Sequence, residues 1–380
     1  MRDRRVVVVG AGPAGLATAR ELKRHGVIPR VLERGDSLGH TWLSLYDSLT
    51  LHTGKHLSVL PGMRFDRATP LFPTRDHFIA YLRDYASRFG IDIETRTAVS
   101  RATPPGNGTP WRLETTHGTF DADAVVFATG IFARPLIPDL PGRAEFRGRV
   151  MHTVDYRRPT PFTGRRVLVV GVGNSGGEIA SELAAAGIDV AISVRSGANI
   201  VPLTLLGIPI QYVAAFLWKL PASVRQRVVG LVRSRTEARR GPPAVPALAA
   251  MTFDRIPLIG FHLDDAVRSG SVRVLPGICG LTREGASFGD GSSHPFDDII
   301  LATGYRPALQ PLDGLVRTDA RGFALRTDRV TSADQPGLYF VGHNYDVTGG
   351  LRNIWKDAPL AAEAIARYAF DQPGLEDVRG

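Results

Sequence analysis

Residues 6–15 read VVVVGAGPAG, an apolar run that ends in a glycine-rich turn and leads into a helical pattern. Residues 167–176 read VLVVGVGNSG and repeat the same plan. Each stretch predicts a β-strand, a tight turn and a helix, and we expect a second strand at 27–33 and at 189–194. In such β-α-β units the turn and the helix N-terminus direct backbone N–H groups toward one point, where a pyrophosphate binds. The sequence therefore predicts two Rossmann-like, dinucleotide-binding units.

The residues that end the second strand of each unit carry opposite charges. Glu33 follows the first turn and Arg195 follows the second at a similar distance. A carboxylate at this position accepts a hydrogen bond from a ribose 2′-hydroxyl, whereas a guanidinium pairs with a 2′-phosphate. We therefore expect FAD in the first unit and NADPH in the second. Two such cofactors in one chain imply electron transfer between them.

A second internal repeat suggests how the two units are connected. Residues 123–130 read DAVVFATG and residues 297–304 read DDIILATG, which are both patterns of a buried strand. We interpret both as strands of the sheet that holds the first cofactor, which the chain leaves near Gly130 and rejoins near Gly304. The expected fold is α/β, three-layered, with two Rossmann-like domains and the NADPH domain inserted into the FAD domain. The expected bounds are 1–158 and 295–380 for the FAD domain and 159–294 for the NADPH domain, with a helical, basic insertion at about 198–250.

Composition narrows the function classes. The single cysteine, Cys279, excludes an intramolecular disulfide, a Cys-x-x-Cys redox pair and a thiolate zinc site. His52 and His56 are spaced as on one face of a helix, but no carboxylate or cysteine cluster accompanies them, so we expect no metal. The first predicted strand begins at Val6, which leaves no room for a secretory signal after Met1, so we expect a cytoplasmic protein.

The formal charge of +9 is concentrated between residues 219 and 240. This basic run lacks interleaved aromatic side chains, so we do not expect a nucleic-acid partner. Residues 198–218 carry no charge, but two prolines and a glycine interrupt them, and a bilayer span there would split the second unit. A peripheral membrane contact through residues 198–240 stays open beside the interpretation as a solvated helical insertion. The sequence does not indicate an oligomeric state.

A third motif carries a resemblance to a known family. Residues 146–156 read FRGRVMHTVDY, with Phe146, Gly148, His152 and Tyr156 in the pattern F-x-G-x-x-x-H-x-x-x-Y. This pattern resembles the identifying motif of the flavin-containing monooxygenases. The short chain and the run YDSLTLH at residues 46–52 are similar to the YUCCA-type branch, whose members oxidatively decarboxylate indole-3-pyruvate.

The resemblance implies a set of site residues. Gly10, Gly12 and Gly15 would approach the FAD pyrophosphate, and Gly171, Gly173 and Gly176 that of NADPH. His52 is the candidate catalytic residue, placed beside the flavin, and residues 146–156 would contact or orient the nicotinamide cofactor. The remaining candidates are Pro13, Ala14, Glu33, Arg34, Trp42, Thr129, Gly130 and Gly342 for FAD, and Asn174, Ser175, Arg195, Ser196, Thr303 and Gly304 for NADPH.

The leading hypothesis is an NADPH-dependent flavin monooxygenase that inserts one oxygen atom of O₂ into a small organic substrate through a flavin C4a-(hydro)peroxide. Such an enzyme needs a closed, apolar pocket more than it needs ionisable catalytic residues. The alternative is an NADPH-dependent flavin reductase that transfers electrons without oxygen insertion; a nucleotide-binding regulatory protein is a third class. The substrate class stays open among amines, thioethers, ketones and 2-oxo acids. For a 2-oxo acid, Arg352 and Lys356 are candidates to bind the carboxylate.

Overall fold

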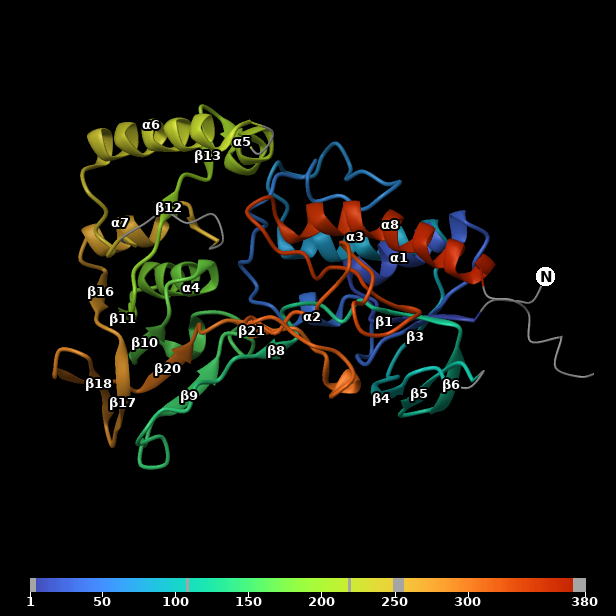
Figure 1. Ribbon diagram of the computed structural model, residues 1–380. Coiled ribbons are helices and arrows are strands. Elements are labelled where there is room, and N and C mark those ends of the chain that lie inside the picture. The colour runs from blue at the N-terminus through green and yellow to red at the C-terminus, as the bar shows by residue number, and fades with distance from the viewer. Residues whose placement is uncertain (1–4, 107–108, 218–219, 249–255, 372–380) are drawn as a thin grey trace, which may run out of the picture.

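The computed structural model describes residues 5–106, 109–217, 220–248 and 256–371 and contains two five-stranded parallel sheets (Figure 1). The first sheet has the order β22-β7-β1-β2-β3. Its strands are β1 (Val6–Val9), β2 (Arg30–Leu32), β3 (Ile93–Glu94), β7 (Ala124–Phe127) and β22 (Leu338–Phe340). The central strands β1 and β7 are buried along their whole length, as continuous apolar runs predict for a sheet covered on both faces.

Different layers cover the two faces of the first sheet. The helices α1 (Pro13–Arg24), α3 (Arg75–Arg88) and α8 (Gly350–Asp371) pack with Val8 and Val126 on one face. An antiparallel sheet of β4 (Val99–Thr103), β5 (Trp111–Thr115) and β6 (Gly118–Ala122) covers Val7 and Phe127 on the other. The short helix α2 (His40–Leu43) follows β2. We call this three-layer assembly the first unit.

The second unit repeats this plan. Its sheet has the order β16-β11-β10-β20-β9, from β9 (Arg149–His152), β10 (Arg166–Val170), β11 (Asp189–Ser193), β16 (Val272–Leu275) and β20 (Asp298–Leu301). The helices α4 (Asn174–Ala185) and α7 (His262–Arg268) pack on one face. The antiparallel strands β17 (Ile278–Thr282), β18 (Gly285–Phe288) and β19 (Ser293–Pro295) cover the other. The α/β class and the parallel sheets agree with the sequence-based expectation.

The expectation that residues 297–304 rejoin the first sheet is wrong. β20 pairs in parallel with β10 on one side and with β9 on the other, so both strands belong to the second sheet. The expected boundaries at 158/159 and 294/295 would separate β9 and β20 from the sheet to which they are hydrogen-bonded. The chain passes between the units beside β8 (Arg134–Pro135) and again beside β21 (Tyr305–Arg306), and these two strands pair with each other.

The described part of the expected insertion at about 198–250 contains short strands and two helices. β12 (Ile200–Val201) pairs with β15 (Leu258–Ile259), and β13 (Thr204–Leu205) and β14 (Ile208–Pro209) form a hairpin. Two helices follow, α5 (Ile210–Leu217) and α6 (Ala222–Arg240). Figure 1 shows α5, α6 and β13 together at one end of the second unit, above α4 and α7. Single 3₁₀ turns, η1 (Thr160–Phe162) and η2 (Gln310–Leu312), complete the described elements.

Candidate active site

The first glycine turn joins β1 to α1, and its three glycines have different spatial requirements. Gly10 has a φ of +107°, and a Cβ added there would lie 2.6 Å from the carbonyl oxygen of Ala128. A Cβ at Gly15 would lie 1.8 Å from the oxygen of Gly10. At Gly12, the N-cap of α1, an added Cβ would meet no described atom within 4 Å. Two of these glycines therefore close the turn, and the third leaves space in front of the helix N-terminus.

The second turn, between β10 and α4, reproduces this arrangement. Gly171 has a φ of +109°, and its added Cβ would lie 2.6 Å from the oxygen of Ala302, while that of Gly176 would lie 2.1 Å from the oxygen of Gly171. Gly173 again faces space that is empty of described atoms within 4 Å. Both turns thus offer a cradle that a side chain would fill, which is the fit that a pyrophosphate requires.

The charged residues at the strand ends occupy different surroundings. Glu33 is buried, and its carboxylate accepts hydrogen bonds from the N–H groups of Ala11 (2.9 Å) and Gly35 (2.8 Å). It therefore stabilises the first turn directly, in addition to any contact with a ligand. Arg195 and Ser196 are exposed beyond the end of β11. The backbone of Gly277 passes the stem of Arg195 so closely that an added Cβ would lie 3.2 Å from its Cγ.

One cavity of about 1190 Å³ extends from the first turn to the second. Most of the predicted site residues line it: Gly10, Gly12, Pro13, Ala14, Glu33, Arg34, Trp42, His52, Thr129, Gly130 and Gly342 from the FAD set, and Gly173, Asn174, Ser175, Gly176 and Gly304 from the NADPH set. Gly15, Gly171, Arg195, Ser196 and Thr303 are not among the described lining residues. The two glycines lie behind their turns, and the hydroxyl of Thr303 donates to the oxygen of Leu136.

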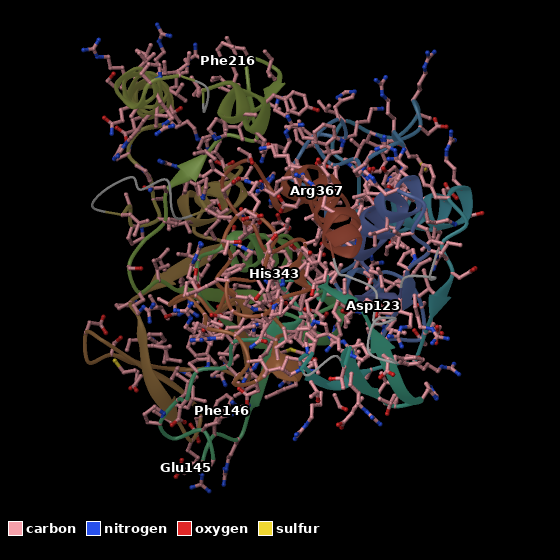
Figure 2. The ribbon with its side chains drawn as sticks, turned by 45° about the vertical axis from the view of Figure 1, so that its right-hand side comes forward. Asp123, Glu145, Phe146, Phe216, His343 and Arg367 are labelled. Carbon is pink, nitrogen blue, oxygen red and sulfur yellow. The ribbon has the colours of Figure 1, made fainter. Side chains whose placement is uncertain are left out.

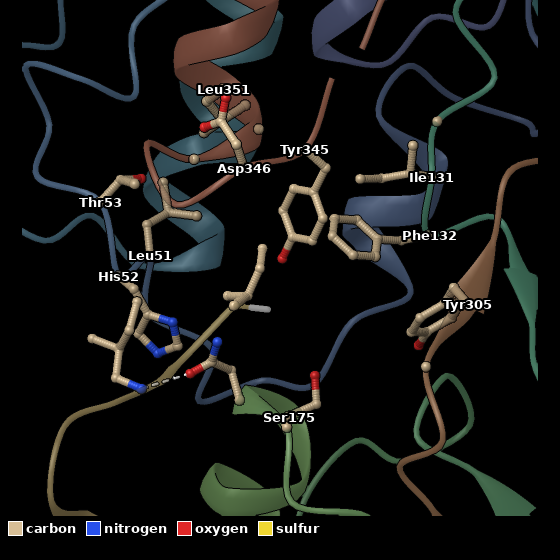
Figure 3. Close-up of a pocket in the computed structure, with 18 of the residues that line it drawn as sticks. Leu51, His52, Thr53, Ile131, Phe132, Ser175, Tyr305, Tyr345, Asp346 and Leu351 are labelled. Atoms are coloured by element: carbon tan, nitrogen blue, oxygen red, sulfur yellow. Dashed lines mark hydrogen bonds between the residues drawn. The ribbon is translucent and has the colours of Figure 1, made fainter. Parts of the chain in front are cut away.

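Three aromatic rings lie close together in the wall of this cavity (Figure 3). The ring of Phe132 meets those of Tyr305 and Tyr345 edge to face, with centroid distances of 5.8 and 5.5 Å. Burial raises the pKa of Tyr345 to about 12, so its hydroxyl stays protonated at neutral pH. The sequence did not single out these three rings, because they come from separate segments that only the fold brings together.

The helix α4 connects the second unit to the first through Glu178. This carboxylate binds His52 and accepts a hydrogen bond from the hydroxyl of Tyr46, both of the first unit. Burial, followed by the charge of Glu178, raises the pKa of Tyr46 well above its ordinary value, so the tyrosine is the donor. His52, Tyr46 and Glu178 all line the cavity. Sequence reasoning singled out His52 but missed its partner.

The motif side chains Phe146, His152 and Tyr156 are buried, and within the segment 146–156 the described lining of the cavity includes Thr153. Phe146 and Tyr156 lie in the cores of the second unit, and the Tyr156 hydroxyl donates to Glu182 of α4 over 2.8 Å. His152 is 2% exposed; its Nδ1 accepts from the N–H of Val154, and its Nε2 lies 3.0 Å from the oxygen of Gly304. Burial lowers the pKa of His152, which keeps the ring neutral and makes Nε2–H the donor. None of these four motif residues is among the described residues that line the cavity.

The Asn174 side chain does not cap α4. Its Oδ1 accepts from the N–H of Ile259, and its Nδ2 donates to the oxygen of Pro257, so the amide holds β15 against the second turn. Behind this contact, α5 and α6 supply a further wall of the cavity. Gln211 of α5 is 3% exposed, and its Oε1 has no hydrogen-bond partner among the described residues. Arg352 and Lys356, the candidates for a carboxylate, do not belong to the described lining.

Comparison with known proteins adds the following matches. Residues 7–201 match the family model of pyridine nucleotide-disulphide oxidoreductases. The chain is 37% identical to indole-3-pyruvate monooxygenase YUCCA1 of Oryza sativa subsp. japonica over 79% of this chain and 76% of that protein. It is 36% identical to indole-3-pyruvate monooxygenase YUCCA6 of Arabidopsis thaliana over 94% and 89%. The flavin-containing monooxygenase of Stenotrophomonas maltophilia has the same fold, with a TM-score of 0.76, 22% identity and coverage of 96% of this chain and 99% of that one.

Proposed function

Because the chain belongs to the YUCCA family of NADPH-dependent flavin monooxygenases, we propose that its substrate is a 2-oxo acid with an aromatic group. The relatives support oxygen insertion over the alternative of a flavin reductase, and the cofactors are FAD and NADPH. The observation that carries the substrate proposal is the group of three aromatic rings in the wall of a cavity that both glycine turns line. Two relatives whose names state indole-3-pyruvate as the substrate give it further support.

In this proposal the first unit holds FAD. Gly12 leaves room for the pyrophosphate, and Glu33 faces the adenosine ribose while its other hydrogen bonds keep the turn closed. Trp42 and His52 line the same cavity and would flank the ring system of the flavin. The bound flavin supplies the activation of dioxygen, which no side chain can provide.

The second unit, residues 149–301 in this proposal and inserted between the two parts of the first, holds NADPH. Gly173 leaves room for its pyrophosphate, and Arg195 at the end of β11 pairs with its 2′-phosphate. Replacement of Arg195 by alanine should then raise KM for NADPH at least about tenfold and leave KM for NADH nearly unchanged. Arg273→Ala, an exposed arginine on the neighbouring strand β16 that pairs with Asp189, is the matched control. An unchanged preference for NADPH in Arg195→Ala would assign the phosphate to another residue.

The substrate would lie against Phe132, Tyr305 and Tyr345, whose rings offer edges and faces to an aromatic group. Gln211, a buried side chain of the lining, is the candidate for its carboxylate, to which the Nε2–H₂ group can donate a hydrogen bond. The largely apolar lining would keep water from the reacting atoms. The overall reaction converts the 2-oxo acid, O₂, NADPH and a proton to the carboxylic acid one carbon shorter, CO₂, water and NADP⁺.

The test is NADPH consumption by the holoenzyme with indole-3-pyruvate, phenylpyruvate, pyruvate, an aromatic amine, a thioether and a ketone, together with product analysis. We expect CO₂ release with the two aromatic 2-oxo acids and little turnover of pyruvate. Gln211→Leu should raise KM for the aromatic 2-oxo acids about tenfold with a smaller effect on kcat, because a ground-state contact is lost. Oxygenation of the amine or thioether without CO₂ release from any 2-oxo acid would overturn the proposed substrate.

A further inference from the structure

The insertion carries an unusual group of exposed apolar side chains. Leu206, Ile208, Phe216, Val224 and Leu231 are 93, 50, 64, 41 and 50% exposed. They come from the β13–β14 turn, from β14, from α5 and from α6, which lie together at one end of the molecule (Figure 1). Figure 2 shows Phe216 at the outer edge of this end. Apolar residues scattered singly need no explanation, but five on one outlying layer mark an interaction surface.

The two sides of α6 differ in what they face. Val229, Val232, Thr236 and Arg240 line the cavity. Val224, Arg227, Leu231, Arg235 and Arg239 recur at three- and four-residue spacing on another face and are not among the described lining residues. None of the residues of α6, all of which are described, is buried. A helix of 19 residues without a buried face lacks the packing that normally stabilises a helix in water.

The turn between β13 and β14 has a backbone conformation that its sequence does not favour. Leu206 has a φ of +51° and Gly207 a φ of +79°, the left-handed pair of a two-residue hairpin. Asparagine or glycine normally occupies the first position, because a Cβ is strained at positive φ. Here a leucine stands there and exposes 93% of its surface. Its apolar side chain gains nothing within the described structure in return for this strain, which points to a function outside the chain.

The charges on the same layer indicate the nature of the partner. Residues 220–240 carry six arginines against the single acid Glu237. Arg233 pairs with Glu237 and Arg240 pairs with Asp265 of α7, whereas Arg227, Arg235 and Arg239 lie on the outward face of α6. Arginine stems can lie along an apolar phase while their guanidinium groups reach its charged boundary. An outward face that mixes arginines with valine and leucine therefore complements an anionic, amphipathic surface. A protein partner would instead offer acidic side chains at fixed positions. The exposed apolar residues come from four separate segments and show no such fixed pattern, so they fit a continuous lipid surface better.

We propose that this layer is a docking surface for the anionic face of a lipid bilayer. Leu206 and Phe216 would enter the boundary between headgroups and acyl chains, and Arg227, Arg235 and Arg239 would pair with lipid phosphates. The contact is peripheral: within the described part of the chain, no helix combines the length and hydropathy needed to cross a membrane. Since α6 also forms a wall of the cavity, the bilayer would lie directly behind the substrate space.

Sedimentation of the holoenzyme with lipid vesicles tests this proposal. We expect binding to vesicles that contain phosphatidylglycerol, weak binding to vesicles of phosphatidylcholine alone, and a decrease as salt is raised. Leu206→Asn should weaken binding about tenfold while stability stays equal or rises, because asparagine suits the turn. The combined Arg227→Gln, Arg235→Gln and Arg239→Gln variant should lose the difference between the two vesicle types.

Ile28→Asn is the matched control, because Ile28 is 81% exposed in the first unit, distant from the insertion in sequence and attached to another sheet. It should bind vesicles as the wild type does. Three outcomes would overturn the proposal: no wild-type binding to anionic vesicles, equal losses in Leu206→Asn and Ile28→Asn, or a wild-type dimer in ultracentrifugation that Leu206→Asn dissociates. The last result would assign the surface to a second copy of the chain.

Discussion

At the scale of single residues, the two open glycines separate cofactor binding from folding. Gly12 and Gly173 have φ values of −82° and −77°, which alanine also adopts, and their added methyl groups would meet no described atom. Gly12→Ala should therefore fold normally and bind FAD at least about tenfold more weakly, a loss of about 1.4 kcal/mol. Gly173→Ala should keep its FAD and show a raised KM for NADPH.

Gly15→Ala provides the contrast, because its methyl group would overlap the oxygen of Gly10 and should destabilise the fold itself. Flavin fluorescence titration and thermal unfolding distinguish the variants. Unaltered FAD affinity in Gly12→Ala would show that the pyrophosphate does not occupy the first cradle.

A buried histidine makes stability depend on pH. His343 is 1% exposed, packs against Phe340 and Phe323, and burial lowers its pKa to about 3, with a contribution from Arg326. Below pH 6.5 the His343 ring is protonated in the unfolded chain, whereas in the folded chain it stays neutral down to about pH 3. The free energy of unfolding therefore falls as the pH falls through this window. Relative to His343→Leu, the wild type should lose roughly 1.4 kcal/mol more per pH unit below 6.

Urea unfolding at several pH values measures this difference. Replacement of the exposed His117 by leucine is the control and should leave the slope unchanged. Parallel pH profiles for the wild type and His343→Leu would mean that the ring is protonated in the folded state.

At the scale of elements, α4 provides two contacts that the sequence did not predict, through Glu178 and Glu182. Glu182 receives the hydroxyl of the buried Tyr156, the last residue of the motif. Tyr156→Phe should therefore lower the free energy of unfolding by about 1 kcal/mol and leave KM for NADPH unchanged. Tyr345→Phe, in the cavity wall, should do the opposite and alter kcat/KM at nearly constant stability. A large change in KM for NADPH in Tyr156→Phe would contradict a packing role of the motif.

The elements also show which features were predictable from the sequence. The strand–turn–helix units at Gly10 and Gly171 were predictable, because their pattern is local and both of these glycines lack room for a side chain. Sheet membership of residues 297–304 was not, since an apolar run predicts a buried strand but not its neighbours. The bond between Glu178 and His52 was also unpredictable, because it depends on how two separately folded layers meet.

At the scale of the whole molecule, Glu178 is a contact through which the units are coupled. Its neutral variant, Glu178→Gln, loses the carboxylate that contacts His52 and weakens the bond from Tyr46 at the cavity wall. We expect retained FAD but a larger share of NADPH oxidation that yields hydrogen peroxide, because the units close less tightly and water enters. Glu363→Gln, at an exposed pair with Arg367 on α8 and not among the described lining residues, is the control. Equal hydrogen peroxide yields in both variants would show that the Glu178 contact does not help to exclude water.

The paired crossings β8 and β21 have a mechanical consequence. Two independent tethers would let one lobe swing and twist in many directions, but hydrogen bonds between Arg134–Pro135 and Tyr305–Arg306 fuse them into one ribbon. Tyr305 belongs to this ribbon and to the aromatic group in the cavity, so any hinge rotation there also turns a ring of the substrate wall. In the proposed function, exchange of the nicotinamide nucleotide and admission of the organic molecule would therefore be mechanically linked steps.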